Sequence, residues 1–197
     1  MADLDSKRHS KHEDLRPKRP HLADLMAKGG GLSGFEWPEQ CGDFEMRIAR
    51  NGVWFYRGSP IGRTQLCQLF ATCLQRDQAG EYWLVTPAER GRVEVDDAPF
   101  FCVELENGVS VDGVKWLRFR TSLEFWVEAN ADHPIEVKLA EDQTPRPYIH
   151  VRDGLWALIA RPVFYHLIDL GQVKTLDDGR EWMHVESHGI EFPIAPL

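Results

Sequence analysis

The sequence has no long apolar run. A helix that crosses a membrane needs about 18 consecutive apolar residues, and no stretch of this 197-residue chain approaches that length. Residues 1–5 are not followed by the apolar segment of a secretory signal peptide. By elimination we expect a cytoplasmic protein with no membrane span.

Cysteine is scarce and has no spacing typical of a metal or redox site. No C-x-x-C pair occurs, and the interval from Cys67 to Cys73 does not place two ligands together on a helix. We therefore expect small buried thiols in a reducing compartment. The four residues are Cys41, Cys67, Cys73 and Cys102.

Linear catalytic motifs are also absent. There is no G-x-S-x-G elbow, no G-x-x-x-x-G-K-[ST] loop and no H-E-x-x-H. On a strand, His184, Glu186 and His188 would share a face and suit zinc, but residues 187–189 are typical of a turn and no fourth ligand is evident. The sequence predicts no metal, no cofactor and no catalytic residue. It leaves open an enzyme whose site is assembled from distant segments.

The charge of the chain argues against broad nucleic-acid binding. The net charge is −8, but residues 1–21 carry six Lys or Arg against four Asp or Glu, so the remainder has a net charge of −10. A body of this sign repels a phosphate backbone. The run Arg16-Pro17-Lys18-Arg19-Pro20 could contact an acidic partner, although such segments are more often only solvated.

Three regions follow one another along the chain. Residues 1–33 are polar and then rich in glycine, which predicts a disordered basic arm. A short helix within it would place Leu22, Leu25 and Met26 on one face. Residues 34–91 and 92–197 are predicted to form a smaller and a larger folded unit, since 43% of the chain is apolar.

The first unit has the pattern hairpin, helix, strand. Apolar and polar residues alternate over 44–48, Asn51-Gly52 predicts a turn, and residues 53–56 return as the second strand. Apolar residues then recur at helical spacing over 66–74, and residues 82–85 begin another strand.

The same pattern recurs near the carboxyl end. Residues 148–159 indicate a hairpin, and Arg161-Pro162 opens a helix with proline at its first position. The stretch Arg50-Asn51-Gly52-Val53-Trp54 matches Arg152-Asp153-Gly154-Leu155-Trp156, with Arg, Gly and Trp identical. An internal duplication is the best explanation, and it predicts equivalent packing for the matched tryptophans.

Five short β-like runs between the repeats predict an enlarged second unit. Turn residues Asn107-Gly108, Asp112-Gly113 and Asp132-His133-Pro134 separate them. We expect this unit to form a strongly bent antiparallel sheet or partial barrel packed by a helix, so that the whole fold is α+β. The runs are 92–95, 100–105, 115–121, 124–128 and 135–139.

A set of short strings indicates a family. They are Gly58-Ser59-Pro60-Ile61-Gly62-Arg63, Leu84-Val85-Thr86-Pro87-Ala88-Glu89, Val95-Asp96-Asp97-Ala98-Pro99-Phe100, His133-Pro134-Ile135-Glu136-Val137 and the segment 152–163. Together they resemble a bacterial family of uncharacterised proteins, the domain of unknown function numbered 1285, from about residue 35 to the end. The resemblance implies a duplicated domain whose carboxyl half is superficially like pleckstrin-homology folds. It also implies a cleft between the halves for a nucleotide-like ligand and a link to signalling.

Arg63 and Arg161 are the first candidate site residues. Each precedes a predicted helix, where the helix dipole disfavours a cation unless an anion occupies the helix start. A phosphate or carboxylate held by the guanidinium would account for each position. The alternative is an internal ion pair with Asp96, Asp97 or another acid.

A second candidate is the run over 115–120. Period two places Trp116, Arg118 and Arg120 on one strand face, where two guanidiniums beside an indole could bind a phosphate and stack a base. The pattern favours the alternative, which is the solvent-facing side of an antiparallel strand.

These features lead to three functional hypotheses. The first is a non-catalytic regulatory protein that binds a small anionic, nucleotide-like ligand between the two units, through Arg63, Arg161 and one of Arg118 or Arg120. The second is a protein–protein interaction module that uses a sheet edge or the basic arm. The third is an enzyme whose site is assembled across the repeats.

Overall fold

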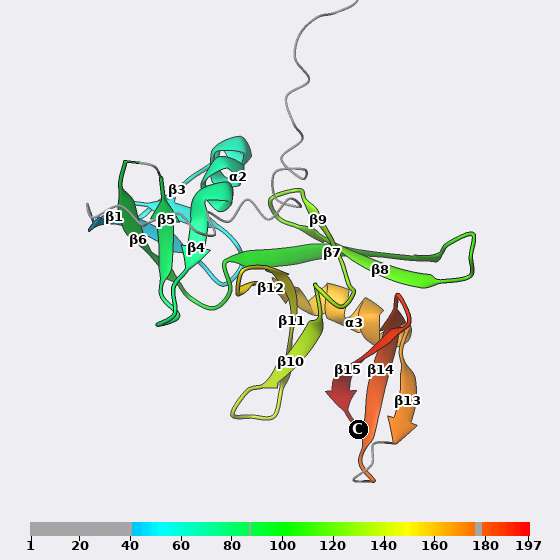
Figure 1. Ribbon diagram of the computed structural model, residues 1–197. Coiled ribbons are helices and arrows are strands. Elements are labelled where there is room, and N and C mark those ends of the chain that lie inside the picture. The colour runs from blue at the N-terminus through cyan, green and yellow to red at the C-terminus, as the bar shows by residue number, and fades with distance from the viewer. Residues whose placement is uncertain (1–40, 87, 176–178) are drawn as a thin grey trace, which may run out of the picture.

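The protein is a three-sheet molecule with two helices in the part that the computed structural model describes, which is residues 41–86, 88–175 and 179–197 (Figure 1). The fold is mostly β-sheet, so the α+β prediction is confirmed only roughly. The arm predicted over residues 1–33 lies outside the described residues. No helix among the described residues is long and apolar enough to cross a membrane.

The first sheet has the strand order β3-β2-β1-β6-β5-β4. Strands β1 and β6 are parallel, and the other neighbours are antiparallel. Helix α2 (Thr64–Cys73) connects β3 to β4 and buries Cys67 and Ala71 in the core. The strands are β1 (Cys41–Ile48), β2 (Trp54–Tyr56), β3 (Ser59–Pro60), β4 (Leu74–Arg76), β5 (Tyr82–Val85) and β6 (Arg90–Val95).

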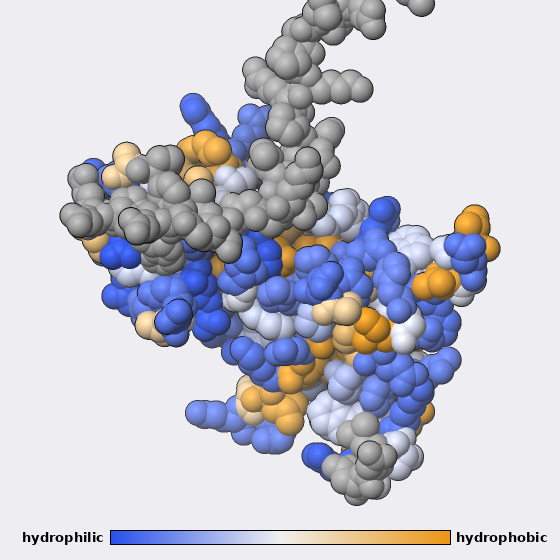
Figure 2. All heavy atoms as spheres, in the orientation of Figure 1, coloured by the Kyte–Doolittle hydropathy of each residue, from blue (hydrophilic) through white to orange (hydrophobic). Residues whose placement is uncertain are grey.

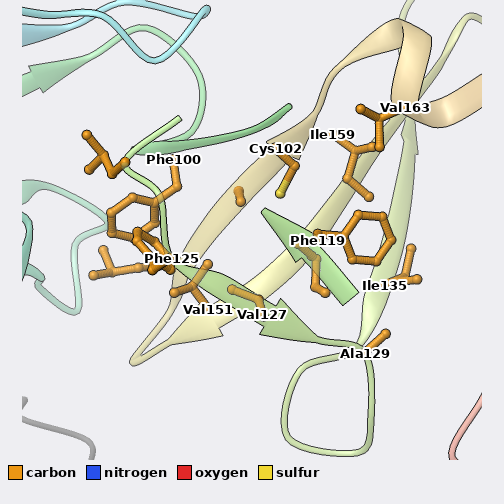
Figure 3. Close-up of a cluster of buried hydrophobic side chains, with 14 of the residues drawn as sticks. Phe100, Cys102, Phe119, Phe125, Val127, Ala129, Ile135, Val151, Ile159 and Val163 are labelled. Atoms are coloured by element: carbon orange, nitrogen blue, oxygen red, sulfur yellow. The ribbon is translucent and has the colours of Figure 1, made fainter. Parts of the chain in front are cut away.

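The second sheet is curled into a half-barrel, as the sequence predicts. Its order is β10-β11-β12-β7-β8-β9, and only the β12–β7 pair is parallel. Phe100, Phe119 and Phe125 lie on its concave side, and Ile159 and Val163 continue this core towards helix α3 (Arg161–Asp169) (Figure 3). The strands are β7 (Phe100–Val109), β8 (Lys115–Thr121), β9 (Trp126–Glu128), β10 (Ile135–Leu139), β11 (Pro145–Arg152) and β12 (Leu155–Ile159).

The third sheet completes the second repeat. Strands β13 (Gln172–Thr175), β14 (Glu181–Ser187) and β15 (Ile190–Pro196) follow α3 as an antiparallel meander. Apart from the two-residue strand β3 in the first, both repeats therefore have the element order hairpin, helix, three strands, which confirms the duplication. In the first repeat the last strand, β6, pairs with β1. In the second, β10 occupies the corresponding edge of β11, and β15 packs beside β10 (Figure 1).

The two matched hairpins differ by one residue in the turn. The first turn has three residues and ends on Gly52, with φ of 80°. The second has only Asp153 and Gly154, with φ of 44° and 72°, the signature of a type I′ turn. A bulge at Val151 offsets this difference, because His150 pairs with Trp156 just as Ile48 pairs with Trp54.

The matched tryptophans nevertheless pack differently, because opposite faces of the two hairpins enter the core. Trp54 is 2% exposed in the main core and Val53 37% exposed, whereas in the second hairpin Leu155, the match of Val53, is 0% exposed. Trp156 is half-buried on the other face, with its ring 5.0 Å from that of His150. The prediction of equivalent packing is therefore wrong for this pair.

The predicted turn at Asn107-Gly108 is also wrong, because both residues lie inside β7 and the chain reverses around Gly113. Gly108 is opposite Trp116, and a Cβ at this position would lie 2.5 Å from the indole. The glycine therefore makes room for an aromatic ring and does not mark a turn.

Candidate functional site

A pocket of about 330 Å³ lies where the two repeated units meet. Arg50 reaches it from the β1–β2 turn of the first unit, Arg146 from β11 and Arg161 from the first residue of α3. Phe101 and Phe164 supply apolar walls. We call this site the seam pocket.

Acids neutralise part of the positive charge in the seam pocket. Asp97, with 10% of its side chain exposed, pairs with Arg146 and lies 3.6 Å from the Nε of Arg50. The Tyr148 hydroxyl donates to Asp97 at 2.8 Å. Burial, and then the hydrogen bond to Asp97 and its charge, raise the pKa of Tyr148 to about 12. No such ion pair holds Arg161 among the described residues.

The start of α3 faces the seam pocket. Arg161 is its first residue and Pro162 its second, so the prediction that proline comes first is wrong by one position. No side chain caps this end within the described chain, and uncapped amides at a helix start favour anions. On the rim, the backbone N–H of Thr144 lowers the pKa of Asp142, and the charge of Arg161 adds to this effect.

Arg63 lies at the equivalent place in the first unit but not in the seam pocket. It is the exposed residue that precedes α2, and it has no ion pair within the described part of the chain. Asp96 and Asp97, the acids considered as its partners, instead pair with Arg47 and with Arg146. The structure therefore places Arg63 and Arg161 at the starts of two different helices and brings only Arg161 into the seam pocket.

Trp116, Arg118 and Arg120 share the outward face of β8, and the residues between them are buried. Arg118 pairs with Glu106, and Arg120 with Glu104, across the β7–β8 ladder. These acids already neutralise both guanidiniums.

Two indoles also flank Arg118. Its guanidinium lies 5.3 Å from the Trp116 ring centroid and 4.7 Å from that of Trp126. The guanidinium is therefore held between two indoles in a cation–π arrangement on the outward face. Such side-chain contacts between neighbouring strands stabilise the sheet.

Sequence reasoning missed the buried Arg152 as an interaction site. Its guanidinium donates to the carbonyl oxygens of Ala71 at 2.8 Å and Leu74 at 3.2 Å, at the end of α2. Burial lowers the pKa of Arg152. The only sequence signal was its match to Arg50 in the repeat, which gave no partner.

The histidines considered for zinc are held by separate partners. His184 Nδ1 is 3.1 Å from the carbonyl oxygen of Trp182, Glu186 pairs with Lys115, and His188 contacts Glu128 from the β14–β15 turn. Within residues 41–86, 88–175 and 179–197, no three His, Cys, Asp or Glu side chains gather as metal ligands.

The cysteines are all free thiols. Cys67 and Cys102 are buried as expected, whereas Cys73 is half-buried and Cys41 is exposed. The prediction of buried thiols is therefore wrong for Cys41.

Comparison with known proteins identifies the family. Residues 36–98 match the model described as domain of unknown function (DUF1285), N-terminal domain, and residues 99–194 match protein of unknown function (DUF1285), C-terminal domain. The chain belongs to this family. The resemblance found in the sequence is thereby confirmed, and the DUF1285 models divide the chain directly after Ala98, in the connection between β6 and β7.

Two solved structures of DUF1285 family proteins resemble the chain. One, from Silicibacter pomeroyi DSS-3, is 39% identical with a TM-score of 0.71, and covers 82% of this chain and 85% of its own. The other, from Shewanella baltica OS155, is 28% identical with a TM-score of 0.50, and covers 63% of this chain and 90% of its own. Among curated proteins, none matches the chain.

Proposed function

We propose that this protein is a non-catalytic regulatory protein that binds a small anionic ligand in the seam pocket. One observation carries the proposal: arginines from both repeated units, Arg50, Arg146 and Arg161, converge on one pocket beside an uncapped helix start. A ligand there would contact both units. Because its affinity would depend on how the units are arranged, binding would favour one arrangement over others, which is the basis of a regulatory response.

The chemistry of the pocket limits the ligand class. A guanidinium matches the two oxygens of a carboxylate or phosphate. Since Asp97 already pairs with Arg146 and lies near Arg50, Arg161 is the best candidate for the direct contact. The rings of Phe101 and Phe164 suit an apolar or heterocyclic part, as in a nucleotide-like molecule. Arg118 and Arg120 are less suited because Glu106 and Glu104 neutralise them.

Thermal unfolding against a panel of nucleotides, sugar phosphates and carboxylates tests this function. A ligand at one hundred times its Kd adds about 2.7 kcal/mol, or roughly 5–10 °C in Tm at this size. We expect Arg161→Gln to abolish the shift. Arg63→Gln is the matched control, because it makes the same change at the start of the other helix and leaves the pocket intact.

The outcomes separate the hypotheses. Equal loss of the shift in both variants, or a shift that survives Arg161→Gln, would contradict the seam pocket. Conversion of the stabilising compound to a product would replace the binding protein by the enzyme hypothesis. If the protein is folded and no compound of the panel raises its Tm, the proposal as a whole is contradicted.

The tip of the β7–β8 hairpin favours a second candidate, a protein–protein interaction module. Val109, Val111 and Val114 are 63%, 102% and 40% exposed there, and Figure 2 shows this apolar tip projecting from the body. Exposed apolar patches of this kind commonly contact partners. If the tip binds a partner, Val111→Asp should abolish co-purification of that partner and Asp112→Asn should not. Retention by both variants would contradict this candidate.

A further inference from the structure

An apolar groove of about 630 Å³ runs between α2 and the first sheet. Leu66, Leu69 and Phe70 line it from the helix, and Phe44 and Met46 line it from β1. Leu66 is 37% exposed and Leu69 56% exposed, and Figure 2 shows apolar residues at the surface over α2. The groove shares no lining residue with the seam pocket.

The rim of the groove is acidic. Among the described residues, Asp43, Glu45 and Glu89 line it together with a single basic residue, Arg57. Arg57 Nε lies 3.4 Å from Glu45, so this ion pair leaves the charge of the other two acids without a balancing cation on the rim. An occupant that suits both features has apolar side chains for the floor and basic residues for the rim.

We propose that the occupant is the amino-terminal segment of the same chain, with the apolar residues around 22–37 in the groove and the basic run at 16–19 over its acidic rim. The segment joins the fold at Cys41, the first residue of β1, and the next residues of that strand line the groove. Its apolar residues are Leu22, Leu25, Met26, Leu32, Phe35 and Trp37.

Charge and reach both support docking within one chain. Residues 1–21 carry a net charge of +2, whereas the remainder carries −10. The segment is continuous with β1, whose residues Asp43 to Met46 line the groove, so the segment starts beside its binding site. A tethered segment has an effective concentration in the millimolar range, which favours it over a second copy at ordinary protein concentrations.

The free cysteines provide a direct measurement. Cys73 lines the groove, and Cys41 is exposed outside it. Timed alkylation of the full chain with N-ethylmaleimide, followed by mass spectrometry, gives a rate for each thiol. We expect the double variant Leu25→Glu, Met26→Glu to increase the rate at Cys73 by about ten-fold, which corresponds to 1.4 kcal/mol of docking. The rate at Cys41 should not change.

Two further variants keep the result decisive. Ala2→Glu, Leu4→Glu adds the same charge to the arm outside its apolar part, and it should leave the rate at Cys73 as in the wild type. Leu69→Cys places a thiol on the exposed rim of the groove, so that protection can be measured even if Cys73 reacts slowly in every variant.

Equal labelling of Cys73 and of the rim thiol with and without Leu25→Glu, Met26→Glu would overturn the proposal. Protection that increases with protein concentration would also overturn it, because the occupant would then be a second copy.

Discussion

Arg152 joins the two repeats through a single buried side chain. It is 7% exposed, and its guanidinium donates to two carbonyl oxygens at the carboxyl end of α2, where the helix dipole is negative. Asp153, its nearest acid, is 3.4 Å away and largely exposed. The positive charge is therefore stabilised mainly by backbone carbonyls of the other unit.

We expect Arg152→Met to lower the free energy of unfolding by about 3 kcal/mol, because two carbonyl oxygens each lose a hydrogen bond from a buried, charged donor. Urea unfolding followed by circular dichroism measures the change. Arg50→Met is the repeat-matched control. Its side chain is 65% exposed, so the change should stay within about 0.5 kcal/mol. Equal effects of the two variants would show that Arg152 does not join the units.

The raised pKa of Tyr148 predicts that the free energy of unfolding falls at alkaline pH. Its pKa is raised to about 12, while tyrosines of the unfolded chain ionise near pH 10. The unfolded state thus loses the proton first, so the contribution is complete below pH 10 and is lost as the pH rises through 12.

The difference in pKa between the folded and unfolded states contributes on the order of 2–3 kcal/mol to the free energy of unfolding. Urea titrations between pH 8 and pH 11 should show a steeper fall for the wild type than for Tyr148→Phe. Tyr165→Phe, a change at a residue that is 56% exposed, should behave as the wild type. A fall that is unchanged in Tyr148→Phe would contradict the assignment to Tyr148.

At the scale of elements, two neighbouring glycines in the first sheet allow a matched test. Gly42 on β1 pairs with Gly91 on β6. A Cβ at Gly91 would lie 2.2 Å from the Phe44 ring, whereas nothing lies within 4 Å of one at Gly42. We expect Gly91→Ala to cost about 1–3 kcal/mol through overpacking and Gly42→Ala to cost little. Thermal unfolding of both variants is the measurement, and equal Tm values would contradict the packing of Phe44 over Gly91.

Strand positions could be predicted where the local pattern determines them. The run at 135–139 coincides with β10, because apolar and polar residues alternate along it, and the hairpin predicted over 148–159 contains β12. Strands β4 and β13 were not predicted, since three or four residues carry no usable period and their hydrogen bonds come from β5 and β14.

The face of a strand was less predictable than its position. The matching residues around Trp54 and Trp156 indicate the duplication correctly. They do not reveal that opposite faces of the two hairpins enter the core, so that Trp54 is buried in the first and Leu155 in the second. In the same way, the sequence around Gly108 does not show that Trp116 lies opposite this glycine on the neighbouring strand.

At the scale of the whole molecule, one core joins both units. Its buried residues include Met46 and Trp54 from the first unit and Phe100, Leu155 and Ile194 from the second. We expect a single unfolding transition, with equal calorimetric and van't Hoff enthalpies. The free energies of opening measured by native-state amide exchange should be similar for β5 and for β14. Two separate transitions would show that the units fold independently.

The seam pocket depends on this same long-range arrangement. Arg161 was identified from its place at a helix start, whereas Arg146 reaches the pocket through the β11–β12 hairpin and Arg50 comes from the other unit. Nothing local to any of the three arginines indicates the other two.

The parallel pairing of β7 with β12 also has a consequence for synthesis of the chain. Phe100 pairs with Ala157, so the partner strand leaves the ribosome about 57 residues later, or roughly 3–11 seconds later at ordinary translation rates. During that interval one edge of β7 has no partner strand, and unpaired edges are sites of aggregation. We therefore expect the nascent chain to be prone to aggregation at this edge until β12 emerges.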